Sequence, residues 1–436
     1  MSVKEQISEQ SKQEYKEYLE PLKKLRKKGS KGTTIFMIIC CVIGGLAGFF
    51  GAMLGDKLSL SGLEPFPVPD GFGFLYFVAL FVFYLVTTVL HTIIHEGGHL
   101  VFGLLSGYEF LSFRVMSFTI VKKDGKLAVK KFKLLGTLGQ CLMYPPEWKE
   151  GEKYPYLAYN LGGGIFNIIF SILAVPLFFT GSSLLGWMAG IFIFTGAIFA
   201  ISNLIPMTVG IPNDGKNALD CKRSPVAQKA FYLQLKLNAD LSDGTRLSDL
   251  PLDIIQIEKQ EASEKSGLVV ALRMYEIYWY MEHGMDAEAK ALLSEMEAKR
   301  EHMALAFVNS FDLLRMYFML LEETPVERLA AYYNVLKVVF QQNADLSVLF
   351  VKYAYYKLLT DEEREMIEWL SLTNKKGKLP KKLPKVKKPI TAESIYEQIQ
   401  KSAAAYPVVG EAQLYLELTE RVKDSIISTA CDTQEA

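Results

Sequence analysis

The stretch FLYFVALFVFYLVTTVLHTIIHEGGHLVFGLL, residues 74–105, decides the fold, because it joins a long apolar run to His95-Glu96-Gly97-Gly98-His99. About 20 apolar residues span a bilayer as a helix, so residues 72–105 predict a membrane helix. On that helix His95 and His99 lie one turn apart and face the same way, which lets both imidazoles bind one Zn²⁺. Glu96 then lies beside the metal without binding it, where it can take a proton from water.

The plain alternative is that two His and a Glu stand at a helix end by chance. Ionisable side chains are rare inside membrane segments and are usually functional there. We therefore favour a metal site. The apolar part of the helix before His95 already covers about 30 Å at 1.5 Å per residue, so His95 and His99 are expected near its far, cytoplasmic end.

Composition limits the other possibilities. The chain has 436 residues, enough for two or three domains, and its net charge of 0 gives no indication of a nucleic-acid partner. Its 5 Cys are odd in number and form no Cys-x-x-Cys pair, which indicates neither a disulfide framework nor a Cys-type zinc site. A reducing interior is the natural setting for its soluble parts.

Apolar runs of membrane length predict an all-α, polytopic bundle of four spans. The spans are expected at about 33–55, 72–105, 156–180 and 184–206. Lys and Arg gather in the basic N-terminal segment 1–32, in the 106–156 loop and after Pro206. By the positive-inside rule these parts are cytoplasmic. We expect a multi-pass protein of the cell membrane with both termini in the cytoplasm.

A small β-hairpin insertion is expected between the second and third spans. The strand-like runs 110–121 and 126–134 flank Lys123-Asp124-Gly125, and Asp-Gly between such runs is a hairpin signal. The following segment, residues 136–146, is punctuated by Gly and Pro. We interpret it as a loop that re-enters the membrane edge.

The second half of the chain predicts soluble helices. A helical hairpin over Gly267–Met296 resembles part of a tetratricopeptide repeat (TPR), and we expect a TPR-like α-helical domain over residues 216–372. Further helices are expected at about 304–322, 325–341, 345–359 and 361–371, with a capping box at Thr360. A Lys- and Pro-rich linker, 373–390, and a C-terminal helical segment, 391–436, follow. This domain is expected to bind a protein partner or to control access.

A catalytic zinc with two His needs a third protein ligand. The best candidate is Asp214, which follows Asn203-Leu204-Ile205-Pro206 at the end of the last span. His91, one turn before His95, is an alternative, although three ligands along one helix diverge from a single ion; otherwise it packs or supports a ligand. The remaining His and Cys are weaker competitors, because Cys141 and Cys221 lack spaced partners and His283 and His302 lie in the soluble domain.

Asn160 and Asn167 lie early in the third span, near the same depth as the two His. Buried amides in lipid need partners. One interpretation is hydrogen bonding between helices. The other, which we favour for Asn167, is contact with a substrate backbone or with a developing oxyanion.

Together the three motifs resemble the site-two-protease family of intramembrane metalloproteases, peptidase family M50. That family has His-Glu-x-x-His, then Gly-x-x-x-Asn, then Asn-x-x-Pro…Asp-Gly in successive spans, as at His95–His99, Gly163–Asn167 and Asn203–Gly215 here. The resemblance covers residues 72–216. Two departures are Gly163-Gly164 in place of the usual Gly-Pro, and three additional residues between Pro206 and Asp214.

The resemblance implies that His95, His99 and Asp214 bind Zn²⁺ and that Glu96 is the acid/base. It adds Asn203 to Asn160 and Asn167 as candidate substrate or oxyanion contacts. The expected function is a zinc-dependent intramembrane endopeptidase acting on a membrane protein or peptide. The alternatives are a catalytically silent membrane scaffold or adaptor, and a metal transporter, which would need polar residues through the depth of several spans.

Overall fold

The computed structural model is mostly helical and divides into two compact units, each described by itself. The membrane unit comprises Lys31–Lys131 and Gly136–Lys236; the helical unit comprises Met1–Ser30, Phe132–Leu135 and Leu237–Ala436. The structure describes residues 3–29, 73–123, 125–131, 138–149, 151–180, 183–259, 265–300, 303–322, 324–341, 345–374, 377–383 and 390–432. The expected first span, 33–55, lies outside the described residues.

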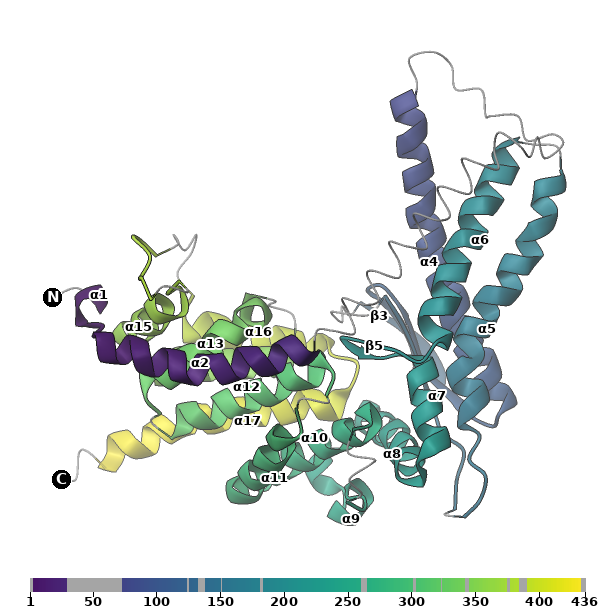
Figure 1. The fold of residues 1–436 in the computed structure, drawn as a ribbon. Helices are drawn as coiled ribbons and strands as arrows, with labels where there is room; N and C mark the ends of the chain where they lie inside the picture. The colour runs from purple at the N-terminus through teal and green to yellow at the C-terminus, as the bar shows by residue number, and fades with distance from the viewer. Residues whose placement is uncertain are drawn as a thin grey trace. The chain divides into compact units, whose positions relative to one another are not determined.

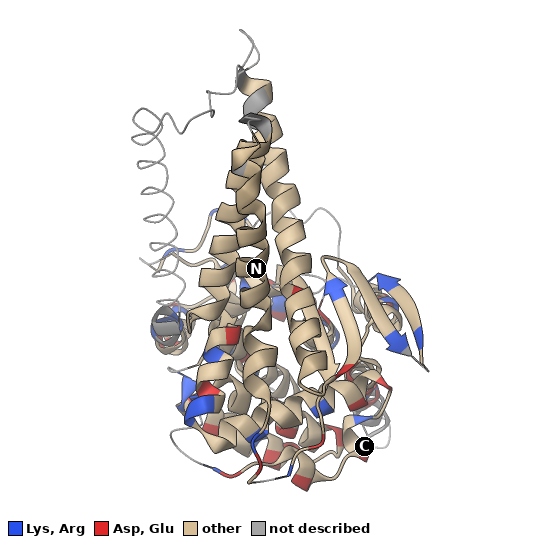
Figure 2. Cartoon of the chain, turned by 90° about the vertical axis from the view of Figure 1, so that its right-hand side faces the viewer, with Lys and Arg blue, Asp and Glu red and all other residues tan. Residues whose placement is uncertain are grey.

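Three long helices form the core of the membrane unit (Figure 1). They are α4 (Gly73–Leu105), α5 (Tyr156–Ala174), which continues into the 3₁₀ turn η1 (Val175–Phe179), and α6 (Ser183–Leu204). Each is long and apolar enough to cross a membrane, which confirms three expected spans as membrane-length helices among the described residues. Glu96 is the only Lys, Arg, Asp or Glu within the three helices, which Figure 2 shows as largely uncharged.

A four-stranded antiparallel sheet fills the connection between α4 and α5. Its strands are β1 (Glu109–Val115), β2 (Phe118–Lys123), β3 (Lys126–Lys131) and β4 (Gly139–Tyr144), in the order β3-β2-β1-β4. The expected hairpin is confirmed as β2–β3, with Lys123 opposite Lys126. Gly125 turns the chain with a φ of +73°, a conformation that favours glycine.

Two expectations about this sheet are wrong. The run 110–121 is two strands, because Met116, with a φ of 55°, turns the chain between Val115 and Phe118. No Gly, Asn or Asp marks that turn, so the sequence resembles one strand. The segment 136–146 contains β4, paired with β1, in place of a re-entrant loop. Its partner is distant in sequence, and no local pattern indicates the pairing.

Beyond α6 the membrane unit continues through a two-stranded ribbon and two helices. The ribbon joins β5 (Thr208–Val209) to β6 (Ile211–Pro212), and α7 (Asp214–Arg223) follows. Helix α8 (Pro225–Ser242) runs across the division between the units. The membrane unit therefore continues through α7 and into α8, as far as Lys236.

The helical unit confirms most of the expected soluble helices. Its elements are α1 (Val3–Gln6), α2 (Glu9–Gly29), η2 (Leu247–Asp249), α9 (Leu252–Ile255), α10 (Gly267–Glu282), α11 (Asp286–Ala298), α12 (Leu305–Leu321), α13 (Val326–Gln341), α14 (Leu346–Leu358), α15 (Asp361–Ser371), α16 (Ala392–Ala405) and α17 (Val409–Asp432). The predicted hairpin is α10–α11, and the capping box at Thr360 is present. The last segment is two helices, parted at Tyr406-Pro407. The helices do not confirm a TPR-like repeat.

The N-terminal helix α2 belongs to the core of the helical unit. Tyr15, Leu19 and Leu22 are buried, and α2 packs chiefly against α13. These residues recur at helical spacing, so one apolar face of α2 covers α13. Helix α2, within the basic segment 1–32, therefore shares a core with residues that lie more than 200 positions later.

A buried ion-pair network fixes the end of α2. Arg26 donates to Asp312 Oδ2 at 2.7 Å and to the Val335 carbonyl at 2.7 Å, while Arg300 donates to Asp312 Oδ1 at 2.9 Å. Asp312 has no exposed surface, so its carboxylate depends on these two arginines for its hydrogen bonds. Removing one partner of such a buried pair is costly.

We expect Arg26→Met in the full chain to release α2, because Asp312 would keep only Arg300 as a charged partner. The free energy that keeps α2 docked should fall by about 3 kcal/mol. The undocked population then rises on the order of 100-fold, and cleavage at the buried Tyr15 by a protease specific for aromatic residues rises with it. Mass spectrometry of the N-terminal fragments measures this. Lys12→Met, which removes a surface pair with Glu9 on the same helix, is the control. Equal protection of both variants would contradict the docking role of Arg26.

Candidate metal centre

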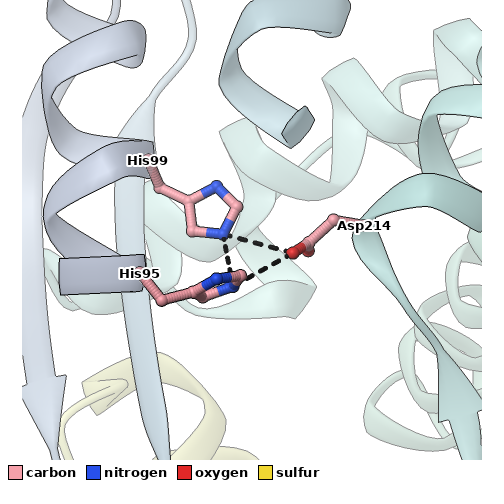
Figure 3. A group of neighbouring side chains, drawn as sticks. All are labelled: His95, His99 and Asp214. Carbon is pink, nitrogen blue, oxygen red and sulfur yellow. Dashed lines mark hydrogen bonds and ion pairs between the residues drawn. The ribbon is translucent and has the colours of Figure 1, made fainter. Parts of the chain in front are cut away.

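His95, His99 and Asp214 come together near the C-terminal end of α4. The two His lie one turn apart on α4, with their Nε2 atoms 3.1 Å apart. Asp214 is the first residue of α7, and its Oδ2 lies 3.1 Å from His95 Nε2 and 3.4 Å from His99 Nε2 (Figure 3). One carboxylate oxygen thus faces both imidazoles.

The ribbon β5–β6 explains how the longer connection from Pro206 still delivers Asp214 to the two His. Gly210, with a φ of +77°, reverses the chain between the two short strands. Asn213 then returns to the end of α6, where its side-chain amide donates to the Ser202 carbonyl at 2.6 Å. The additional residues are absorbed in the turn, so Asp214 starts α7 beside the bundle.

Glycines let α5 approach α4 closely at the depth of the site. A Cβ on Gly98 would lie 2.3 Å from the carbonyl oxygen of Gly162, and a Cβ on Gly162 would lie 2.7 Å from that of Gly98. A Cβ on Gly163 would lie 2.6 Å from the ring of His95. Small residues are what such close helix contacts in membranes require. The glycine run in α5 therefore provides the space for His95.

Each His uses its Nδ1 for a hydrogen bond away from Asp214. His99 Nδ1 lies 2.7 Å from the Tyr159 carbonyl, which can only accept, so this nitrogen carries the hydrogen. His95 Nδ1 lies 3.0 Å from Asn167 Oδ1. Both rings are therefore arranged to leave the lone pair of Nε2 facing Asp214, as metal-binding His usually are.

The three ligand atoms fit Zn²⁺. Metal–ligand bonds of about 2.0 Å in a tetrahedron place neighbouring ligand atoms about 3.3 Å apart. The separations here are 3.1, 3.1 and 3.4 Å. Among the described residues, this is the group of His, Cys, Asp and Glu whose ligand atoms lie close enough to hold an ion. Three protein ligands would leave a fourth position for water or substrate.

The competing ligands do not join this group. His91 uses both ring nitrogens in hydrogen bonds to Phe192 and Asn167. Cys141 and Cys221 are buried free thiols, and neither belongs to the cluster. His283 stacks on Trp279 in the helical unit, with ring centroids 3.7 Å apart. His302 lies outside the described residues.

The charge of Asp214 suits a metal ligand. Burial raises the pKa of its carboxyl group, but charge and hydrogen bonds from His99 and His95, when their Nε2 atoms carry hydrogens, outweigh this effect and hold the pKa well below its usual range. Its place in the first turn of α7 adds a favourable interaction with the helix dipole. Asp214 is therefore ionised at neutral pH.

A cavity of about 460 Å³ adjoins the cluster. Its wall includes Glu96 together with Asn160 and Asn203, two of the three predicted amide contacts. Each of these amides donates to a carbonyl one turn back in its own helix, at 2.8 Å. No hydrogen bond among the described residues uses their amide oxygens, so these remain able to accept. Asn167 is fully buried behind His95 and does not line the cavity.

Two features beside Glu96 have no signal in the sequence. The backbone of β4 passes so close that a Cβ on Gly139 would lie 2.4 Å from Glu96 Oε1. Arg114, buried within the sheet, donates to the carbonyls of Gly139 at 3.3 Å and Met116 at 3.1 Å. In the sequence, a single Arg in a strand resembles a surface residue. Its position near Glu96 follows only from the pairing of β1 with β4, which places Arg114 opposite Gln140.

Comparison of the chain with protein-family models, curated proteins and solved structures finds no match. Two imidazoles and a carboxylate are donors of the kind that bind zinc, and a second, buried carboxylate beside them can act as a base.

We expect Gly163→Ala to weaken zinc binding at least tenfold, because the added Cβ would displace the ring of His95. The measurement is competition for zinc with a chelator of known affinity, on purified protein. Gly97→Ala is a matched control, since a Cβ there meets nothing within 4 Å although Gly97 lies between the same two His. Equal affinity in both variants would contradict the close contact between α5 and His95.

Proposed function

We propose that the protein is a zinc-dependent intramembrane endopeptidase of the site-two-protease type. The observation that carries the proposal is the convergence of His95, His99 and Asp214 beside Glu96, which is the only Lys, Arg, Asp or Glu in three apolar helices. Ligands alone would suit a structural metal. A buried carboxylate that lines the adjoining cavity, without joining the ligand cluster, favours catalysis.

Glu96 moves the proton in the proposed reaction. When bound, Zn²⁺ supplies a Lewis acid and lowers the pKa of a coordinated water. Glu96 accepts the proton of the attacking water and returns it to the leaving amine, as a general base and then a general acid. Asn160 and Asn203 contact the substrate backbone through their amides. His95, His99 and Asp214 keep their positions throughout.

The substrate binds as an extended segment along β4. A membrane helix satisfies its own amides, so it must unwind locally before its peptide bond can be attacked. Strand β4 is the last in the sheet order, and within the described residues it pairs only with β1. Its other edge can pair with an unwound segment, and Gly139 of the same strand lies close to Glu96. A membrane-anchored protein or peptide is therefore the expected substrate class.

We expect Glu96→Gln to reduce cleavage by about 10² to 10⁴ while zinc content stays near that of the wild type. The amide keeps the size of the side chain but cannot accept the proton. Substrates are obtained by trapping: membrane proteins that co-purify with Glu96→Gln are identified and then presented to both forms at matched zinc content. Glu152→Gln, an exposed Glu of the same unit, is the control.

Equal cleavage by wild type and Glu96→Gln would remove Glu96 from the mechanism. A wild type that binds zinc but cleaves none of the trapped proteins would favour the scaffold alternative. The transporter alternative predicts zinc flux into proteoliposomes that persists in Glu96→Gln.

The topology we propose has both termini on one side of the membrane. Helix α2 and residues after Leu237 share a core, so the chain between them crosses the membrane an even number of times. Three candidate spans lie in the described residues between them. The predicted span 33–55 supplies the fourth crossing, and the Lys and Arg bias places the shared core in the cytoplasm.

Reporter fusions test this topology. A reporter after Gly62 is expected to read outside, and one after Ala436 inside, because one predicted span separates Gly62 from the N-terminal helix. A cysteine introduced in α2 should be shielded from impermeant reagents added to intact cells. An outside signal for the C-terminus would reject the four-span arrangement.

A further inference from the structure

A chain of buried side chains runs from α6 through α4 and α5 to the metal ligand His95. His91 Nε2 lies 2.8 Å from the Phe192 carbonyl, and His91 Nδ1 lies 3.0 Å from Asn167 Nδ2. Asn167 Oδ1 then lies 3.0 Å from His95 Nδ1. His91 and Asn167 have no exposed surface, so water cannot replace these partners.

The direction of each hydrogen bond is fixed by carbonyl groups, which can only accept. His91 Nε2 must donate to the Phe192 carbonyl, which makes Nδ1 of the neutral ring an acceptor. Asn167 Nδ2 donates to that Nδ1 and also to the His91 backbone carbonyl at 3.0 Å. Asn167 Oδ1 therefore faces His95, and His95 Nδ1 must carry a hydrogen.

We infer that His91 and Asn167 are positioning residues that fix the hydrogen of His95 on Nδ1 and so keep Nε2 free for the metal. This inference rests on the proposed zinc site and assigns Asn167 a task other than the oxyanion contact expected from the sequence. It also assigns His91 a task other than that of third ligand. Neither side chain touches the substrate cavity.

The position of Asp214 explains why the hydrogen of His95 must be held on Nδ1. Its Oδ2 lies 3.1 Å from His95 Nε2, so before metal binds it would attract a hydrogen to that nitrogen. The imidazole would then donate to Asp214 in place of binding zinc. The acceptor Asn167 Oδ1 opposes that tautomer, and His91 holds Asn167 in the required orientation. His99 has a backbone carbonyl, Tyr159, in the same role, so only His95 depends on side chains.

Packing keeps His91 in place. Its ring lies against Phe192, with centroids 4.2 Å apart, and a Cβ on Gly196 of α6 would lie 2.5 Å from His91 Cε1. The ring therefore has little room to turn. Replacing His91 with an apolar residue therefore tests its hydrogen bonds. A substitution elsewhere between α4 and α6 serves as the control for effects on helix packing.

The experiment measures zinc affinity by chelator competition, and the absorption spectrum of the Co²⁺-substituted full-length protein, in four forms. His91→Leu removes both hydrogen bonds and should weaken zinc binding about 10- to 100-fold and change the Co²⁺ spectrum. His91→Gln should restore both, because its amide can donate to the Phe192 carbonyl and accept from Asn167. Thr87→Val, one turn earlier, removes a buried 3.4 Å contact between α4 and Thr195 of α6 and should match the wild type.

A double-mutant cycle shows whether His91 acts through Asn167. In an Asn167→Ala background, which should itself weaken zinc binding, His91→Leu should have no further effect on affinity. Additive losses would overturn the inference, as would failure of His91→Gln to restore affinity. Unchanged zinc affinity and an unchanged Co²⁺ spectrum in His91→Leu would also overturn the inference, but would not contradict the proposed zinc site. A wild type that binds no zinc would instead reject the proposed function, and this inference with it.

Discussion

Polar groups placed in apolar helices need partners from within the protein, and the membrane unit is built around that constraint. His95, Glu96 and His99 stand in a helix that is otherwise suited to lipid. The two His find partners in Asn167 and the Tyr159 carbonyl on α5 and in Asp214 on α7, and the backbone of β4 passes close to Glu96. The helices, the sheet and the ribbon meet where these groups are.

These contacts require helices α4 and α5 to lie close together. A hydrogen bond from a ring in one helix to a carbonyl in another requires the two backbones to lie near each other, and Gly98 and Gly162 allow this. The same contact leaves space for the His95 ring over Gly163. The departure from the family pattern at Gly163-Gly164 is thus compatible with the site, because the glycine that the ring needs is present.

Much of this arrangement could be predicted from the sequence, since its signals are local. Apolar runs mark α4, α5 and α6; the spacing of His95 and His99 defines a ligand pair; and Asp-Gly marks the β2–β3 turn. What could not be predicted depends on contacts between distant segments. Examples are the pairing of β4 with β1, the position of Arg114, and the docking of Arg26 against Asp312. Asn167 was identified as important, but its neighbours decide what its amide does.

The end of the membrane unit illustrates the same limit. Hydropathy falls after residue 205, and the sequence alone led us to expect the helical domain from residue 216 onward. The compact unit continues to Lys236, because the cavity is not complete where the apolar helix α6 ends. Asp214 begins α7, and Phe231 and Leu235 of α8 form part of the cavity wall. Hydropathy reports where a helix leaves lipid, whereas the extent of a folded unit is set by which residues the site needs around it. In this chain those residues lie about thirty positions beyond the last span.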